Sequence, residues 1–259
     1  MKRLTTAFFM AWGMFCAIPC PYQRWDERLR PLMLVCFPLL GMLLGGIWCS
    51  AAWLIARWGG LGLFGPALLA ALPCLLTGFF HLDGFMDCCD AILSRRPLEE
   101  RQRILKDSHV GAFAVICVDL LLLLSVALFA TAEWSKVWRP LLFLPAAARG
   151  PAALAVLSLS PMGGSSYAGG FQAQVGRIHR LTAAALTVIF PVLSAALFGI
   201  PGLCAAAAAA CGSALALRCG VRQLGGMSGD ISGFAVTVGE FCGVAALTFL
   251  GKQVWAWTW

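Results

Sequence analysis

Long apolar blocks separated by short polar segments make up most of this chain. Seven of these blocks approach or exceed the roughly 20 residues that a helix needs to cross a bilayer. They cover residues 31–56, 61–80, 112–132, 139–159, 181–198, 203–217 and 231–250. Apolar residues run continuously within each block instead of alternating, which favours helices over the strands of a barrel. The pattern predicts an all-α, polytopic integral membrane bundle of about seven spans, with residues 1–259 forming a single domain.

Two shorter segments complete the set of predicted helices. Residues 4–18 are apolar but short for a span, and the segment ends at Pro19 and Pro21. We expect it to be retained and to lie half-inserted or at the interface, because residues 17–20 make a poor signal-peptide cleavage site. Pro97 at a first helical position, followed by Glu99 and Glu100, is typical of a helix start, and residues 98–106 are predicted to form a cytoplasmic amphipathic helix.

The composition agrees with a membrane protein. The chain is 60% hydrophobic and only 12% charged, whereas soluble domains usually carry about twice that charge. Its twelve cysteines show no CxxC pair and no zinc spacing, which indicates packing in an apolar or reducing setting. The net charge of +7 comes from short loops between apolar blocks, so we expect a lipid bilayer and no nucleic acid as partner.

The basic residues predict how the chain crosses the bilayer. If the N-terminus and residues 22–30 share one side, fourteen Lys and Arg lie on that side and four lie opposite. Positive residues accumulate in cytoplasmic loops, so the first side is predicted to be cytoplasmic. The polar segments 81–111, 160–180 and 218–230 then all emerge on the cytoplasmic side, where they can form one site.

The first of these polar segments opens with an unusual acidic run. Asp83, Asp87 and Asp90 follow His81 at spacings that place all three carboxylates on one narrow helix face. Carboxylates packed so closely repel one another, and a bound Mg²⁺ shared with substrate phosphates would relieve the repulsion. A solvated loop beside a membrane helix is the plainer alternative. His81 falls about 160° from Asp83 on a helix, so either the helix begins after it or His81 is a supporting residue.

Other polar residues extend the candidate site. The glycine-rich residues 225–230 would let backbone N–H groups approach a phosphate, and Asp230 opens a span. Intramembrane ionisable residues are functional candidates by default, and this chain has Asp119, Arg149 and Glu240. Arg149 could pair with either acid, and both a structural ion pair and a role toward substrate stay open.

Four segments, spread in order over most of the chain, carry a family resemblance. They are residues 77–90 (TGFFHLDGFMDCCD), 106–113 (KDSHVGAF), 225–233 (GGMSGDISG) with Glu240, and 37–41 (FPLLG). Together they resemble the motifs of the cobalamin synthase family, also called adenosylcobinamide-GDP ribazoletransferases or cobalamin-5′-phosphate synthases. The departures are Cys88, Cys89 and Ala91, where the family often has Thr, Ala and Gly, and His109, where it often has another basic or polar residue.

The resemblance implies a Mg²⁺-dependent phosphoryl transfer at the bacterial inner membrane, with the active site facing the cytoplasm. Adenosylcobinamide-GDP and α-ribazole, or its 5′-phosphate, would give adenosylcobalamin, or its 5′-phosphate, and GMP. We assign the predicted metal ligands to Asp83, Asp87, Asp90 and Asp230, and the predicted catalytic residues to His81, Asp83, Lys106 and Asp107. Predicted substrate-binding residues are Ser108, Arg149, Gly226, Gly229 and Glu240.

Two other functions fit parts of the pattern. Another Mg²⁺-dependent membrane phosphotransferase, of the CDP-alcohol type, or a prenyl transferase would also use spaced aspartates, but their longer or paired aspartate motifs are absent from the sequence. A transporter would bind a cation near a cytoplasmic mouth, although transporters usually place key charges at the midplane. A homo-oligomer is also possible, since Gly41, Gly45 and Gly46 line one side of the first span.

Overall fold

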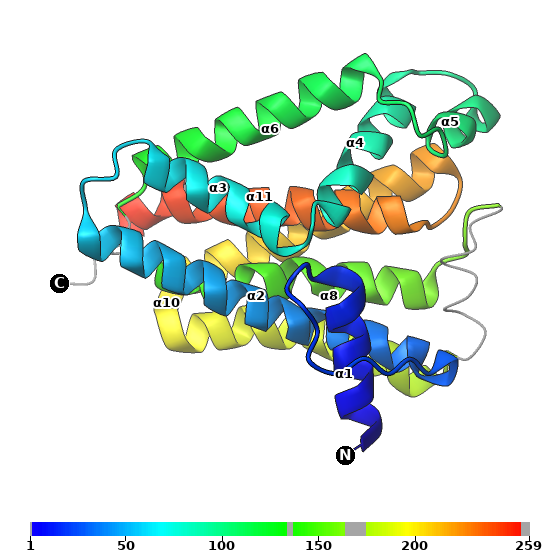
Figure 1. Ribbon diagram of the computed structural model, residues 1–259, viewed down its shortest axis with the longest axis horizontal. Helices are drawn as coiled ribbons and strands as arrows, with labels where there is room; N and C mark the ends of the chain where they lie inside the picture. The colour runs from blue at the N-terminus through cyan, green and yellow to red at the C-terminus, as the bar shows by residue number, and fades with distance from the viewer. Residues whose placement is uncertain (1, 134–136, 164–174, 255–259) are drawn as a thin grey trace.

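The computed structural model describes residues 2–133, 137–163 and 175–254, and these ranges contain helices and no strand. Most of the predicted loop 160–180, from 164 to 174, lies outside the described residues. The helices are α1 (Lys2–Phe15), α2 (Arg30–Trp58), α3 (Phe64–Leu76), α4 (Phe80–Leu93), α5 (Leu98–Ile104), α6 (Ala112–Thr131), α8 (Leu144–Ser158), α10 (Arg177–Leu224) and α11 (Gly229–Val254), with 3₁₀ turns η1 (Glu27–Leu29) and η2 (Arg139–Leu142) (Figure 1). The all-α prediction is confirmed.

Five helices are long and apolar enough to cross a membrane, and α3 with α4 would make a sixth if that bent pair forms one broken span. The five cover Glu27–Trp58, Ala112–Thr131, Arg139–Ser158, Arg177–Leu224 and Gly229–Leu250. The chain is therefore a multi-pass membrane protein, and the exact number of crossings stays a prediction.

The predicted span over residues 61–80 is wrong as a single straight helix. The α3 helix has only 13 residues, and the chain then bends by 92° into α4. Gly78 (φ 58°) and Phe79 (φ 64°) both adopt the left-handed conformation at the bend, which ends one right-handed helix and starts another. The polar run from residue 81 is thus the second arm of a bent pair.

The predicted spans over 181–198 and 203–217 are the two arms of α10, which reverses at Gly199 (φ 64°, ψ −152°). Figure 1 shows the two arms folded back alongside each other. Thr187 in the first arm and Ala210 in the second line the same groove beside α8, so the predicted tight turn at residues 199–202 is present.

The centre of the bundle is α8, and small residues allow its neighbours to approach it closely. Ala147, Ala148 and Ala152 on this helix are fully buried. A Cβ added to Gly41 of α2 would lie 2.7 Å from the Ala146 backbone, so only glycine permits this crossing. Gly41 is therefore buried against α8 within the chain, and the predicted homo-oligomer stays a prediction.

The N-terminal helix α1 crosses the bundle instead of running along it (Figure 1). Its end is anchored at the α3–α4 bend, because the Ala17 N–H donates to the Leu76 carbonyl at 2.8 Å. The Phe15 ring lies 4.5 Å from that of Phe37 on α2 and stacks 6.2 Å from that of His81. The predicted apolar N-terminal segment is thus a helix that packs against the start of α4.

Candidate active site

The acidic helix α4 crosses α11 at a point where both helices lack side chains. A Cβ added to Gly84 would lie 2.7 Å from the Asp230 carbonyl oxygen and 2.9 Å from its Cα. One added to Gly233 would lie 3.0 Å from the His81 carbonyl oxygen, and the Thr237 hydroxyl donates to that same carbonyl at 3.2 Å. These backbone contacts bring the carboxylates of α4 up to the start of α11.

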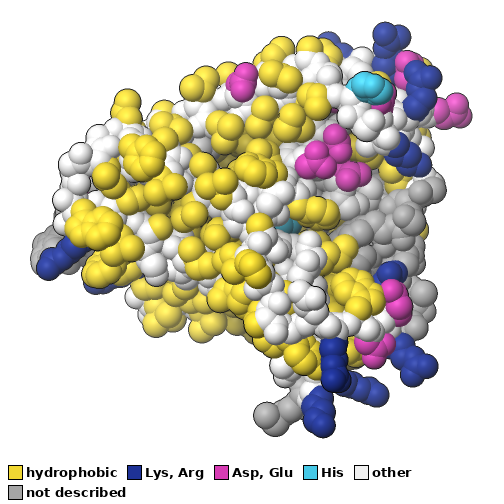
Figure 2. All heavy atoms as spheres, viewed as in Figure 1, with side chains coloured by type: hydrophobic (Ala, Val, Ile, Leu, Met, Phe, Trp, Pro, Cys, Tyr) yellow, Lys and Arg dark blue, Asp and Glu magenta, His cyan; other side chains and the backbone are white. Residues whose placement is uncertain are grey.

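Three carboxylates share this crossing. Asp87 is half-buried, and the charges of Asp83, Asp230 and Asp90 all act on it. Asp83 is exposed, while Asp230 is half-buried and accepts a hydrogen bond from the Ser228 hydroxyl at 3.3 Å. Figure 2 shows acidic side chains gathered over the α4 region of an otherwise largely hydrophobic face. The structure therefore joins the first and third predicted polar segments.

Asp90 has a structural role that sequence reasoning missed. Its two carboxylate oxygens accept the backbone N–H groups of Gly111, at 2.6 Å, and Ala114, at 2.9 Å, at the start of α6. A carboxylate in this position also interacts favourably with the partial positive charge at the N-terminus of α6. The predicted metal role of Asp90 stays a prediction, and Asp90 would have to fill that role while it caps α6.

The loop that carries Lys106 is tied to the same end of the bundle. The Lys106 ammonium donates to the Gly163 carbonyl at 3.3 Å. Residues 160–162 pair in turn with Met227 through two backbone hydrogen bonds of 2.9 Å. The described parts of all three predicted polar segments therefore meet at this end.

Asp107 and Ser108 lie on the exposed tip of that loop. The Asp107 carboxylate accepts the His109 N–H at 3.0 Å and lies 2.6 Å from His109 Nδ1. These hydrogen bonds hold the pKa of Asp107 below its usual range. Asp107 is therefore ionised at neutral pH and available to a ligand.

The glycines of residues 225–229 pack more tightly than the sequence predicts. Gly226 is buried, and a Cβ there would lie 2.6 Å from the backbone of Met162. This glycine is required by the approach of the two loops. Gly229 opens α11 and is half-buried. A role for either residue in phosphate binding stays a prediction.

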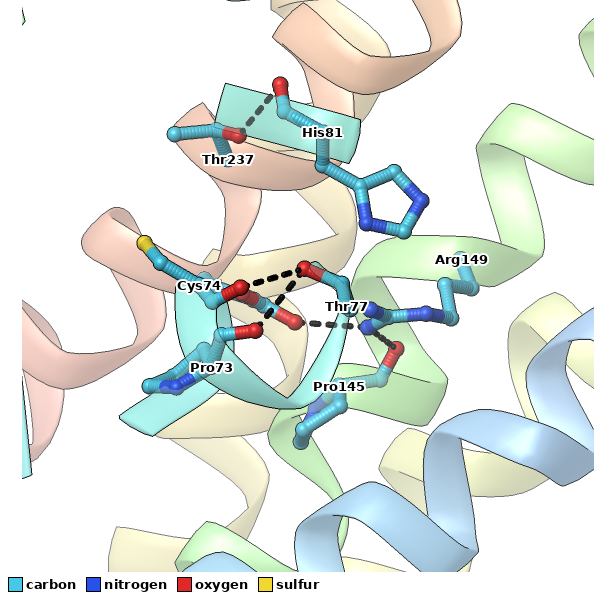
Figure 3. Close-up of polar contacts among 8 residues, drawn as sticks. Pro73, Cys74, Thr77, His81, Pro145, Arg149 and Thr237 are labelled. Atoms are coloured by element: carbon cyan, nitrogen blue, oxygen red, sulfur yellow. Dashed lines mark hydrogen bonds and ion pairs between the residues drawn. The ribbon is translucent and has the colours of Figure 1, made fainter. Parts of the chain in front are cut away.

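His81 is buried beneath the acidic face. The α4 helix begins at Phe80, so the alternative in which the helix starts after His81 is wrong. The residue is 5% exposed, and its ring points toward Arg149 (Figure 3). Neither ring nitrogen has a hydrogen-bond partner among the described residues. This position fits a supporting residue, and the catalytic role assigned to His81 stays a prediction that the structure does not favour.

Arg149 and Glu240 form a buried ion pair below His81. The Arg149 Nη1 lies 2.6 Å from Glu240 Oε1 and donates to the Pro145 carbonyl at 3.0 Å (Figure 3). The guanidinium also lies 5.3 Å from the centre of the Phe37 ring. The partner of Arg149 is therefore Glu240 and not Asp119, which is exposed on α6. The substrate-binding role of the pair stays a prediction.

The donor chemistry of the acidic face fits Mg²⁺, although no cage is preformed. Among the described residues, no three His, Cys, Asp or Glu side chains are placed to hold one ion together. Mg²⁺ is usually held by one or two carboxylates together with substrate phosphates and water. The all-oxygen set of Asp83, Asp87 and Asp230 is compatible with such a shared ion.

Comparison with known families matches residues 7–248 to the family described as cobalamin-5-phosphate synthase. This chain belongs to the cobalamin-5-phosphate synthase family. Among its relatives is the adenosylcobinamide-GDP ribazoletransferase of Clostridium perfringens (strain 13 / Type A), 35% identical over 95% of this chain and 99% of the relative. Proteins of the same name from Clostridium botulinum (strain Alaska E43 / Type E3) and Geotalea daltonii are each 34% identical, over 94% and 95% of this chain and 97% and 98% of theirs. No solved structure matches the chain.

The match to the cobalamin-5-phosphate synthase family includes every element of the candidate site. It starts within α1 and ends within α11. The resemblance drawn from four short segments therefore extends to the whole bundle.

Proposed function

We propose that this protein is an adenosylcobinamide-GDP ribazoletransferase that works at the end of the bundle where α4 crosses α11. The observation that carries the proposal is the meeting of Asp83, Asp87 and Asp230 at a glycine crossing, in a chain whose relatives bear that name. In the reaction, a ribose hydroxyl of α-ribazole, or of its 5′-phosphate, forms a new bond to the phosphorus attached to cobinamide. The bond from that phosphorus to GMP breaks, and GMP leaves.

The three carboxylates would hold Mg²⁺ against the diphosphate. The bound ion would neutralise charge on the phosphates and on the leaving oxygen. We assign proton acceptance from the attacking hydroxyl to an oxygen of Asp83, because Asp83 is the exposed member of the three.

Lys106 and Asp107 would close the substrate side of the site. The Lys106 ammonium, now held by the Gly163 carbonyl, can exchange that contact for a phosphate oxygen. The ionised Asp107 would accept hydrogen bonds from ribose hydroxyls. The gathering of Lys and Arg toward the α5 end of the bundle and around α1 (Figure 2) supports a cytoplasmic position for this end, in the bacterial inner membrane.

Replacing single carboxylates tests the proposal. Asp83→Asn and Asp87→Asn should each lower GMP release by at least about a hundredfold, in the range expected when a group acting in the transition state is lost. The matched control is Glu99→Gln, an exposed carboxylate on α5, which should keep full activity. Full activity in either aspartate variant would exclude the assigned roles, and release of CMP would favour a CDP-alcohol phosphotransferase.

A further inference from the structure

A cavity separate from the acidic face lies between α1 and the segment that follows it. It has a volume of about 440 Å³, and its walls include Phe9, Gly13, Cys16, Ile18, Tyr22 and Trp25. Small-molecule sites usually have volumes of about 300–1,000 Å³. The cavity is therefore large enough for one compact ligand, and no residue of the reaction described above lines it.

Hydrogen bonds hold the walls of this cavity in place. The Trp12 indole N–H donates to the Ile18 carbonyl at 2.9 Å. The Cys20 thiol lies 3.4 Å from the Phe9 carbonyl oxygen and 3.3 Å from that of Tyr22, so it bridges helix and loop. Pro19 and Pro21 restrict the backbone between these contacts. The space is thus built into the fold, which lowers the entropy lost on binding.

The walls combine aromatic faces with a free cation. The Phe9 and Tyr22 rings lie 5.5 Å apart at 49° to each other. The Arg24 guanidinium lies 5.7 Å from the centre of the Tyr22 ring, and within the described residues it makes no ion pair. Aromatic rings stack on the planar bases of nucleotides, and guanidinium groups bind phosphate oxygens. This combination recognises a base and a phosphate in one molecule.

The cavity wall is joined to the bend that presents the acidic face. The Ala17 N–H donates to the Leu76 carbonyl, as described above. A Cβ on Gly78 would lie 3.4 Å from Ala17 Cβ. The Phe15 ring contacts that of Phe80 at 5.8 Å, and Phe80 precedes Asp83 by three residues. A ligand in the cavity therefore lies next to the element that positions Asp83.

We infer that this cavity binds the base of a nucleoside monophosphate unit, with Arg24 on its phosphate. The inference rests on the proposed function only in the choice of the two candidate nucleotides. GMP and α-ribazole 5′-phosphate share the required chemistry: a planar base, a ribose and a phosphate. The two are separated by measuring the binding of each.

Gly13 provides a direct way to fill the cavity. A Cβ at this position would meet only the Cys20 Cβ, at 3.9 Å, so a side chain can start here without a backbone clash, and Gly13 lines the cavity. Gly13→Leu places a branched side chain in the space, whereas Gly13→Ala changes helix propensity and leaves most of the space open.

The experiment measures equilibrium binding of GMP and of α-ribazole 5′-phosphate to the full chain in detergent, without turnover. Gly13→Leu and Arg24→Gln should each weaken binding of one of the two nucleotides by about tenfold or more, as expected from lost stacking or lost phosphate contact. Gly13→Ala should remain within about twofold of the unchanged protein. The nucleotide whose affinity falls is the ligand.

Unchanged affinity for both nucleotides in Gly13→Leu, with an unchanged melting temperature, would overturn the inference. If Gly13→Leu does not fold, Arg24→Gln and Tyr22→Leu decide the matter by the same measurement. Failure of this inference is distinguishable from failure of the proposed function. If the unchanged protein releases GMP from adenosylcobinamide-GDP, and every variant binds each nucleotide as tightly as the unchanged protein does, the proposed function holds and this binding site is excluded.

Discussion

The glycine crossing between α4 and α11 can be tested by a single methyl group. In Gly84→Ala the added Cβ would lie 2.7 Å from the Asp230 carbonyl oxygen, where ordinary contact begins at 3.4 Å. The helices must therefore separate by about 0.7 Å, because neither the added Cβ nor the Asp230 carbonyl oxygen can move without its backbone. Asp83 and Asp87 move with α4 on one side, and Asp230 moves with α11 on the other.

The expected cost is small for stability and large for activity. Overpacking of this kind lowers the unfolding free energy by about 1–3 kcal/mol, and replacing glycine by alanine within a helix raises it by about 1 kcal/mol. The net loss of unfolding free energy should be about 1 kcal/mol. A displacement of about 1 Å among catalytic groups can lower the rate by about a hundredfold, so we expect GMP release to fall by roughly ten- to a hundredfold.

The assay is GMP release in detergent, with thermal melting of the same samples. Gly46→Ala on α2 is the matched control, because its Cβ would meet only Leu142 Cδ1 at 3.9 Å. This control should keep full activity and an equal or higher melting temperature. Full activity in Gly84→Ala would refute the claim that this crossing positions the carboxylates.

Three further predictions concern the groups around the site. Arg149→Met leaves Glu240 as an unpaired buried charge and should lower the unfolding free energy by about 3–5 kcal/mol; adding Glu240→Leu should recover most of the loss, and strictly additive losses in thermal melts would contradict the pairing. Asp90→Ala removes the cap of α6 and should cost about 0.5–2 kcal/mol, with faster hydrogen exchange of the first-turn amides of α6; unchanged exchange would argue against capping. His109→Ala removes the side-chain hydrogen bond to Asp107, which is the largest of the interactions that lower its pKa, and keeps the backbone N–H bond, so this pKa should rise part of the way toward its ordinary value. In the unchanged protein, the Asp107–His109 pair should stabilise the loop fully at pH values above the ordinary aspartate pKa of about 4. This stabilisation should be lost as the pH falls through the lower pKa that Asp107 has in the folded protein. An Asp107 carboxyl signal in NMR that titrates at the same pH in both proteins would contradict this.

The local part of the structure could be predicted from the sequence. Continuous apolar blocks specify helices because a bilayer requires every backbone polar group to be paired within its own segment. The spacing of Asp83 and Asp87 places them on one helix face by geometry alone. The position of Pro97 before Glu99 and Glu100 predicts the start of α5 to within one residue, since the helix begins at Leu98 and Pro97 is its N-cap.

The remaining features depend on contacts between distant segments. Phe79 adopts a left-handed conformation that its side chain disfavours, so no local preference predicts the bend before α4. Asp90 looks equivalent to its acidic neighbours in sequence, yet it faces α6 because that helix starts beside it. Gly84 is recognisable in the sequence as unusual, since glycine is unfavourable within a helix. The structure shows that glycine is needed there because the Asp230 backbone approaches so closely.

The cavity beside α1 could not be foreseen either. Phe9 and Tyr22 are separated by 13 positions, and they meet only because Cys20 and Trp12 fold the loop back onto the helix. Single aromatic residues in an apolar segment give no indication of such a pairing.

The central claim is the transfer reaction, and one measurement tests it most directly. The purified protein is incubated with adenosylcobinamide-GDP and Mg²⁺, with and without α-ribazole, and GMP and cobalamin are quantified together. The account predicts equal amounts of GMP and cobalamin when α-ribazole is present, neither product without it, and at least about a hundredfold less of both in Asp83→Asn. GMP release that does not depend on α-ribazole, or the absence of cobalamin from a folded protein, would contradict it.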